Sequence, residues 1–174
     1  MISNNYIPEK INDFNAYQDG KVLIGVASSV TLPQVRMQST TVEGVGIAGA
    51  LESPVVGQFE SMEQEIQFNT LYSSATELLN PLKNINLTFR ASQQVLDKAE
   101  GYAHKGMRVV EKGRVKSFNP GRIQKGASME ATVTLELVYI MVENDGEQLL
   151  EVDKLNGVYK VKGEDMLSEI RALI

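Results

Sequence analysis

Residues 129–142 constrain the possible fold more than any other part of the chain. Apolar side chains occupy every second position from Val133 to Met141, and polar ones such as Thr134 and Glu136 alternate with them. This period of two is typical of a β-strand with one buried face. The sequence Asn-Asp-Gly that follows at 144–146 predicts a tight hairpin leading into a neighbouring antiparallel strand.

Strand and turn signals of the same kind extend through most of the chain. Helix signals are confined to 74–77, which fits a capping box, and to 166–173. This pattern predicts a mainly β protein, an antiparallel β-sandwich or barrel with one short internal helix and a C-terminal helix. The 174 residues fit a single domain, 1–174, with an N-terminal arm at 1–20. The other segments predicted to be extended are 21–32, 34–41, 59–69, 84–95, 107–118, 147–153 and 158–162, the last two joined by a tight hairpin at Asn156-Gly157.

Composition excludes several classes of function. The chain has a net charge of −5 and no cysteine, which excludes disulfides, thiolate chemistry and cysteine-based zinc sites. The negative charge also disfavours a general affinity for nucleic acid or an anionic membrane. His104 is the single histidine and lies in a turn-like stretch, where we expect a surface residue. We therefore predict no catalytic residue, no metal ligand and no enzymatic activity.

The glycines at 44, 46 and 49 match the G-x-G-x-x-G pattern of dinucleotide-binding proteins. That site needs a helix directly after the glycines, and Pro54 and Gly57 prevent one here. It also needs positive charge near the phosphates, yet no Lys or Arg lies between Arg36 and Lys83. We therefore expect no bound cofactor.

The same glycines lie in an unusually apolar segment, residues 42–57. We predict a long loop here, too long for a tight hairpin turn. An apolar loop of this length needs a cover, which is either the core of the same chain or another copy. Because the chain also offers strong strands with edges to pair, self-assembly is the favoured prediction.

The strand predicted at 59–69 has two distinct faces. Met62, Ile66 and Phe68 fall on one side, and the acidic Glu63 and Glu65 fall on the other. Two carboxylates could suggest a glycosidase pair, but no tryptophan exists to stack on a sugar and nothing apolar is placed to raise a pKa. A solvated acidic face is the favoured interpretation.

A basic stretch contrasts with this acidic strand. Residues 105–125 hold seven Lys and Arg residues against Glu111 alone. Solvated loops and faces would explain this asymmetry, and so would a self-complementary surface in which the basic stretch of one copy meets an acidic segment of the next.

These features resemble the major tail tube proteins of contractile-tailed bacteriophages and of phage-tail-like (R-type) bacteriocins. The similarity includes Val30-Thr-Leu-Pro33 before a Gly-rich segment with Gly46-Ile-Ala-Gly49, the acidic strand 59–68, and Gly113-Arg-Val-Lys116. It is strongest over 139–162, where a strand, an Asp-Gly turn, Leu-Leu-Glu-Val-Asp and an Asn-Gly pair follow in the family order. The first 20 residues match little.

The resemblance implies a structural protein without cofactor. Six subunits would form a ring whose inner strands close into one barrel, and rings would stack into a rigid tube that conducts DNA or ions. Its partners would be further copies, the sheath, the baseplate and the tail terminator, with passing DNA bound non-specifically, in a virion tail assembled in the bacterial host cytoplasm. The alternatives are a monomeric β-sandwich that binds a ligand and a related baseplate or type VI-like tube component.

Three sets of residues follow from this resemblance as hypotheses. The loop 42–57 would contact a neighbouring subunit, the acidic strand would face the lumen, and the basic stretch would contribute to ring stacking. The loop residues are Val42, Gly44, Val45, Gly46, Ile47, Gly49, Leu51, Val55 and Val56; the lumen residues are Glu63, Glu65 and Gln67; the stacking residues are Arg108, Lys112, Arg114, Lys116 and Arg122.

Overall fold

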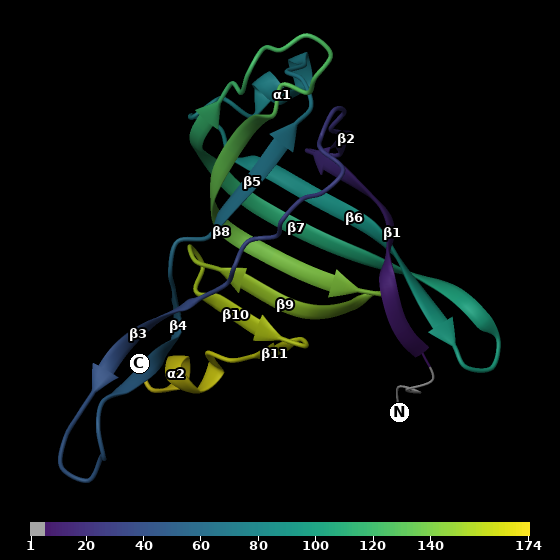
Figure 1. Ribbon diagram of the computed structural model, residues 1–174. Coiled ribbons are helices and arrows are strands. Elements are labelled where there is room, and N and C mark those ends of the chain that lie inside the picture. Colours follow the sequence, from purple (N-terminus) through teal and green to yellow (C-terminus); the bar gives the residue numbers. More distant parts are fainter. Residues whose placement is uncertain (1–5) are drawn as a thin grey trace.

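The computed structural model describes residues 6–174, without the side chain of Ser74. The chain is mainly antiparallel β-structure with two short helices, as predicted (Figure 1). In chain order the elements are β1 (Tyr6–Gln18), β2 (Lys21–Val22), β3 (Met37–Val42), β4 (Leu51–Phe59), β5 (Glu63–Phe68), α1 (Ser73–Glu77), β6 (Ile85–Asp97), β7 (Gly101–Asn119), β8 (Ala131–Asn144), β9 (Glu147–Asp153), β10 (Val158–Val161), β11 (Glu164–Asp165) and α2 (Ser168–Ala172).

A nine-stranded sheet forms the body of the molecule. Its order is β11-β10-β9-β8-β7-β6-β1-β2, and β5 pairs with β8 as well. The first half of β8 pairs with β5 and its second half with β9, so β5 and β9 follow one another along the same edge of β8. The remaining two strands, β3 and β4, form a separate hairpin that projects from the sheet (Figure 1).

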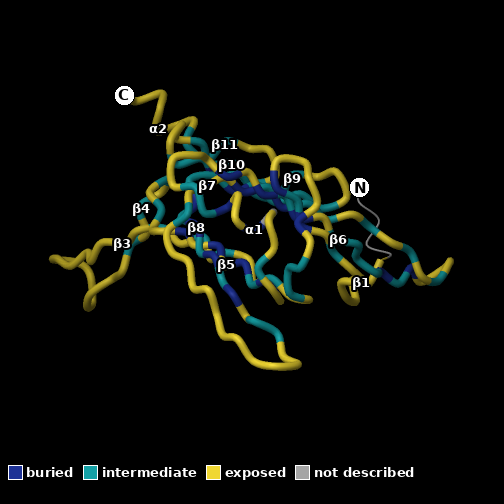
Figure 2. Tube along the Cα trace, turned by 90° about the horizontal axis from the view of Figure 1, so that it is seen from above, coloured by how far each residue is buried: buried dark blue, intermediate teal, exposed yellow. Residues whose placement is uncertain are grey.

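The core lies on one face of this sheet. Alternate residues of the central strands point to it, such as Phe89 of β6, Leu135 of β8 and Ile66 of β5. Segment 23–36 and helix α1 cover these side chains, with Val30 and Leu78 among the covering residues. Figure 2 shows the buried residues gathered along the central strands, whereas the β3–β4 hairpin is largely exposed.

The predicted strands from residue 59 onward are confirmed. At the first hairpin Asp145 and Gly146 have φ of 52° and 81°, the left-handed backbone that a two-residue turn between twisted strands requires. The second hairpin is not a tight turn, because four residues separate β9 from β10. The Asp153 carboxylate accepts hydrogen bonds from the backbone N–H groups of Leu155 and Asn156 and holds this longer loop.

The prediction of a strand over 21–32 was wrong beyond Val22. Gly25 has a φ of +86°, which breaks the extended run, and the chain then crosses the sheet as irregular cover. Within residues 6–174, this segment pairs with the sheet through an isolated bridge from Val26 to Phe68 and a hydrogen bond from the Leu23 N–H to the Ala16 carbonyl. Its β-branched residues therefore signalled burial against a sheet rather than membership of one.

The segment 42–57 is a hairpin with a loop at 43–50, not one long loop. Thr40 pairs with Ser53 and Thr41 with Glu52. The Glu52 carboxylate also accepts hydrogen bonds from the Ser39 and Thr41 hydroxyls. Polar cross-strand contacts of this kind hold a hairpin that has no core of its own.

Smaller differences lie at the helices and the N-terminus. Helix α1 begins at Ser73 after Tyr72, so Ser74 lies inside the helix and the predicted capping box does not form. Strand β11 occupies part of the predicted C-terminal helix and leaves α2 at Ser168–Ala172. Of the predicted N-terminal arm, residues 6–18 form β1 of the main sheet, and 1–5 lie outside the described residues. His104 is exposed as predicted, but it belongs to β7 rather than to a turn.

Candidate functional site

The face of the sheet opposite the core is polar and open, and we call it the polar face. Glu63, Glu65 and Gln67 of β5 lie on it, because their neighbours at alternate positions are the buried Gln64, Ile66 and Phe68. Strand β7 contributes basic residues to the same face. Arg108, Lys112 and Arg114 stand opposite Glu143, Tyr139 and Glu136 of β8.

The structure therefore brings together two sets of residues that the sequence analysis assigned to different surfaces. Lys116 contacts the Glu63 carboxylate directly, and its Nζ lies 3.6 Å from Glu136. The hydrogen bond to Glu63 raises the pKa of Lys116 above its usual value. Arg108 pairs with Glu143 at 2.5 Å. The polar face thus carries acidic and basic side chains together, joined by cross-strand ion pairs, rather than an acidic patch beside a basic one.

Further along the polar face, ion pairs and cation–π contacts continue the same pattern. Lys160 of β10 lies 3.1 Å from Glu151 of β9. The Nζ of Lys112 lies 4.8 Å from the centre of the Tyr139 ring. Among the predicted basic residues Arg122 is the exception, because it lies in the loop after β7 and pairs with Glu130 at 3.2 Å.

The β3–β4 hairpin ends in a tip, residues 42–51, whose apolar side chains are exposed. Val45 is fully exposed, Ile47 is 43% exposed and Leu51 is 56% exposed. Gly46 and Gly49 adopt φ of +97° and +113°, and an added Cβ at either would meet no atom within 4 Å. Their backbone angles favour glycine, but no packing within the subunit demands it.

The base of this hairpin, in contrast, is held against the body. A Cβ added at Gly57 would lie 2.5 Å from Leu167, next to α2, so the two segments pack closely there. The rings of Phe59 and Tyr159 meet edge to face with centres 5.1 Å apart. The backbone N–H of Glu60 donates to the carbonyl of Arg36. The base of the β3–β4 hairpin is thus packed against the body of the subunit, while its tip is exposed.

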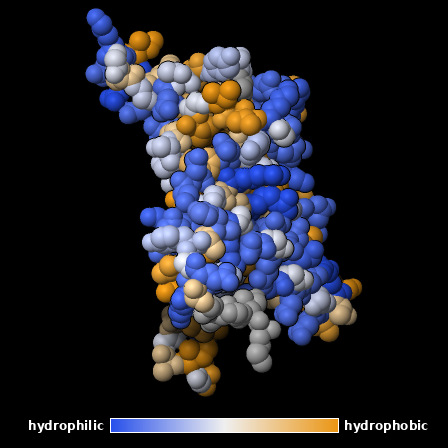
Figure 3. Space-filling view, turned by 90° about the vertical axis from the view of Figure 1, so that its right-hand side faces the viewer, coloured by the Kyte–Doolittle hydropathy of each residue, from blue (hydrophilic) through white to orange (hydrophobic). Residues whose placement is uncertain are grey.

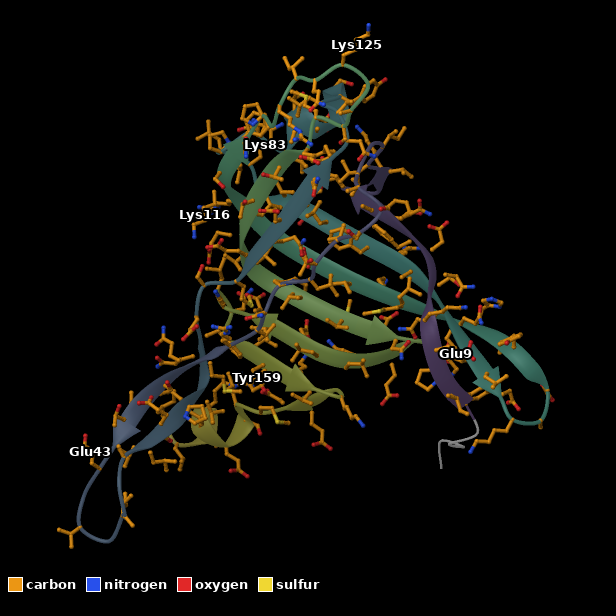
Figure 4. The ribbon with its side chains drawn as sticks, in the orientation of Figure 1. Glu9, Glu43, Lys83, Lys116, Lys125 and Tyr159 are labelled. Carbon is orange, nitrogen blue, oxygen red and sulfur yellow. The ribbon has the colours of Figure 1, made fainter. Side chains whose placement is uncertain are left out.

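A second exposed apolar region lies at the opposite end of the molecule. We call it the α1 end, formed by residues 70–84 and 119–130 (Figure 1). Leu82 is 93% exposed and Ile123 is 95% exposed. Figure 4 places Lys83 and Lys125 at this end and Glu43 at the hairpin tip. Within residues 6–174, neither lysine makes an ion pair.

Between these ends the surface has a different character. Figure 3, seen from the side of β1 and the β6–β7 hairpin, shows mostly hydrophilic side chains across the middle of the molecule. Its hydrophobic groups gather towards the upper and lower ends. On this side of the subunit the exposed apolar surface therefore lies mainly towards the two ends.

One carboxylic acid is buried in the core. Glu111 of β7 lies between Leu87 of β6 and Ile140 of β8 and is 0% exposed. Neither carboxylate oxygen has a hydrogen-bond partner among residues 6–174. Burial raises its pKa to about 8, because the charged form would lose its solvation. The carboxyl group is therefore mostly protonated at neutral pH.

The described residues offer no cluster of three or more His, Cys, Asp or Glu that could hold a metal ion. A hollow of about 140 Å³ lies between the sheet and segment 27–36, lined by apolar side chains such as Phe14, Leu32 and Met107. It has no polar group to orient a ligand. Within residues 6–174, neither helix has the length or hydropathy to cross a membrane.

An open polar sheet face and exposed apolar side chains at two ends are features typical of a subunit that associates with other chains. Comparison with known proteins specifies the family. The family model for phage tail tube protein FII matches residues 8–174, and the chain belongs to this family. It is a phage tail tube structural protein.

Two curated relatives agree with this assignment. The tail tube protein of Escherichia phage P2 is 27% identical over 168 residues, which cover 95% of this chain and 96% of the relative. The major tail tube protein of Serratia phage KSP20 is 27% identical over 160 residues, covering 92% and 91%. The resemblance inferred from the sequence is confirmed.

Proposed function

We propose that copies of this chain assemble into stacked hexameric rings that form the rigid inner tube of a contractile phage tail or phage-tail-like particle. The tube is a conduit for DNA or ions through the cell envelope. The observation that carries this proposal is the combination of one large open sheet with a projecting hairpin whose apolar tip has no cover in the subunit. The family match over 8–174 supports it.

Strand edges supply the contacts within a ring. Among the described residues, β1 pairs with β6 along its length but with β2 only at Tyr17 and Gln18, so most of its outer edge is unpaired. On the other side of the sheet, one edge of β5 pairs with β8. Within residues 6–174, the other edge of β5 pairs only at an isolated bridge to Val26. Joining such edges between copies completes the hydrogen-bond ladders and removes surfaces that would otherwise aggregate.

The polar face lines the channel in this proposal. Glu63, Glu65 and Gln67 point into the lumen, and so do Arg108, Lys112, Arg114 and Lys116, because they share the face. Acidic partners hold two of these four cations, Lys116 through Glu63 and Arg108 through Glu143, while Lys112 lies over the Tyr139 ring and Arg114 donates to the Asn84 side chain. Such a bore presents few unpaired cations to a phosphate backbone, so DNA passes without adhering.

The same assembly defines the partners and the location of the chain. Its outer surface contacts the surrounding sheath, and the two ends of the tube contact baseplate and tail-terminator proteins. The tube is assembled in the cytoplasm of the bacterial host and becomes part of the tail.

Electron microscopy of the purified chain tests the tube, and charge reversal tests the lumen. We expect the unmodified chain to form tubes with a central channel. Glu63→Lys with Glu65→Lys should still form tubes, but they should retain added DNA. Glu164→Lys with Glu169→Lys is the matched control, since it changes the net charge equally on exposed residues away from β5. Equal DNA retention by both variants would contradict the lumen assignment, and absence of tubes or rings from the unmodified chain would contradict the proposed function.

A further inference from the structure

The loop between β9 and β10 contains the single Asn-Gly pair of the chain, Asn156-Gly157. Asn-Gly is the dipeptide most prone to deamidation, because glycine has no side chain to hinder attack by its own backbone nitrogen. Both residues are exposed to solvent. Such a pair is chemically labile unless the fold keeps the reacting atoms apart.

We infer that Asn156 is a latent site of covalent modification and that the Asp153 carboxylate protects it against deamidation. The inference goes beyond the proposed function and does not depend on it. It assigns to Asp153 a chemical role in addition to holding the shape of the loop.

Deamidation needs one particular arrangement of the Asn156 side chain. The backbone nitrogen of Gly157 must approach Cγ of Asn156, form a C–N bond to it and lose its proton to the solvent. The bond from Cγ to Nδ2 then breaks, Nδ2 takes up a proton and leaves as ammonia, and a cyclic succinimide remains. Water adds to either carbonyl carbon of the ring and opens it to aspartate or isoaspartate.

The structure holds the Asn156 side chain away from this arrangement. Its Nδ2 donates to Oδ2 of Asp153 at 2.7 Å, so the amide is directed to a residue earlier in the chain and not to Gly157. Oδ1 of the same carboxylate accepts the backbone N–H groups of Leu155 and Asn156, both at 3.0 Å. Rotation of the side chain towards Gly157 breaks the Nδ2 hydrogen bond, which is strong because its acceptor is charged.

The backbone on the other side of the reacting bond is held as well. Nη1 of Arg171 in α2 donates to the Gly157 carbonyl at 3.0 Å. The next residue, Val158, pairs with Asp153 in the ladder between β9 and β10. A backbone rotation that carried the Gly157 nitrogen to Cγ of Asn156 would therefore disturb contacts on both strands. Asp153 takes part in both restraints, through its side chain and through its position in β9.

Asp153 is suited to this role because its carboxylate stays charged. Partial burial alone would raise the pKa of Asp153, but hydrogen bonds from Asn156 and Leu155 outweigh it and hold the pKa below its usual value. Deamidation would replace the Nδ2 donor of Asn156 by a second carboxylate facing Asp153. Like charges would then stand where a hydrogen bond was, and we expect the modified loop to open.

Peptide mass spectrometry of the full chain, stored in mildly alkaline buffer, tests the inference. Deamidation replaces NH₂ by OH and raises the mass of the peptide that contains Asn156. Asp153→Ala should deamidate there about tenfold faster than the unmodified chain, as expected from the loss of a hydrogen bond to a charged group. Glu147→Ala is the matched control, since it removes a carboxylate from the exposed start of β9 and should leave the rate unchanged.

A comparison without any change near the loop covers the case in which circular dichroism shows that Asp153→Ala does not fold. The unmodified chain unfolded in guanidinium chloride should deamidate at Asn156 about tenfold faster than the folded chain in sodium chloride of equal concentration. Asn156→Gln should abolish the signal, because its longer side chain cyclises poorly. Equal rates in the folded and unfolded chain would overturn the inference, and so would a folded Asp153→Ala that deamidates at the unmodified rate. Electron microscopy of the unmodified chain tests the proposed function separately.

Discussion

Apolar side chains are buried at the centre of the sheet but exposed at the tip of the β3–β4 hairpin. Ile66 and Phe68 of β5 are 0% exposed and pack inside the subunit. At the hairpin tip Val45 is fully exposed and Ile47 is 43% exposed, although both are as apolar as many core residues. From this difference we predict that subunit stability and assembly depend on separate residues, so that each can be changed without the other.

The largest expected effect separates the two regions directly. Phe68→Ala should lower the free energy of unfolding of the subunit by about 3–5 kcal/mol, because it removes a fully buried ring and leaves a cavity. Ile47→Asp should change it by less than about 0.5 kcal/mol, because the side chain is exposed, yet it should abolish tube formation. Denaturant unfolding and electron microscopy of both variants check this. A large loss of subunit stability in Ile47→Asp would contradict the predicted separation between residues for stability and residues for assembly.

A second prediction concerns the core alone and its response to pH. The folded pKa of Glu111 is raised to about 8, so stability associated with its neutral form is present below pH 4.5 and is lost as the pH rises towards 8. Glu111→Gln should remove this dependence and raise the stability at pH 8 relative to the unmodified chain, by on the order of 2–4 kcal/mol.

Melting temperatures measured between pH 5 and pH 8 provide the check. The unmodified subunit should lose stability across this range, while Glu111→Gln should give a flatter profile. Equal slopes for the two proteins would show that Glu111 does not titrate between the folded and unfolded states. Tube formation by the variant at a fixed pH serves as the control, since Glu111 lies away from the proposed contacts.

The smallest expected effect lies on the polar face. Lys116→Met should leave the stability of the subunit almost unchanged, because both partners of its ion pair with Glu63 are half exposed and screened by solvent. If the polar face lines the channel, the variant should assemble normally. Loss of tubes on this substitution would assign Lys116 to a contact between copies instead, and electron microscopy distinguishes the outcomes.

The sequence predicted those parts of the fold in which local pattern and final environment agree. The alternation in β5 and β8 identified both the strands and their buried faces, and the Asp145-Gly146 turn identified the connection from β8 to β9. Segment 23–36 was mispredicted because its Val and Ile content is equally suited to covering a sheet. The pattern of residue types alone does not distinguish these two environments.

The site was less predictable because it depends on contacts between distant segments. Glu63 and Lys116 are separated by 53 positions, and only the order β5-β8-β7 makes them neighbours. The burial of Glu111 did leave a local signal, because it shares a strand face with Val109 and Met107. Using that signal to predict the burial of Glu111 requires knowing which face of β7 points to the core. The Gly-rich hairpin tip was recognised by its apolar content and β3 by the extended segment predicted at 34–41, but β4 was predicted as part of a loop.

We propose that the hairpin tip, exposed in the subunit, is buried in the tube. Amide hydrogen exchange of residues 43–50, compared between the isolated subunit and assembled tubes, tests it most directly. We predict rapid exchange in the subunit and exchange slower by at least about tenfold in tubes, with the amides of β8 equally protected in both as an internal reference. The same rate for residues 43–50 in both states would contradict the claim.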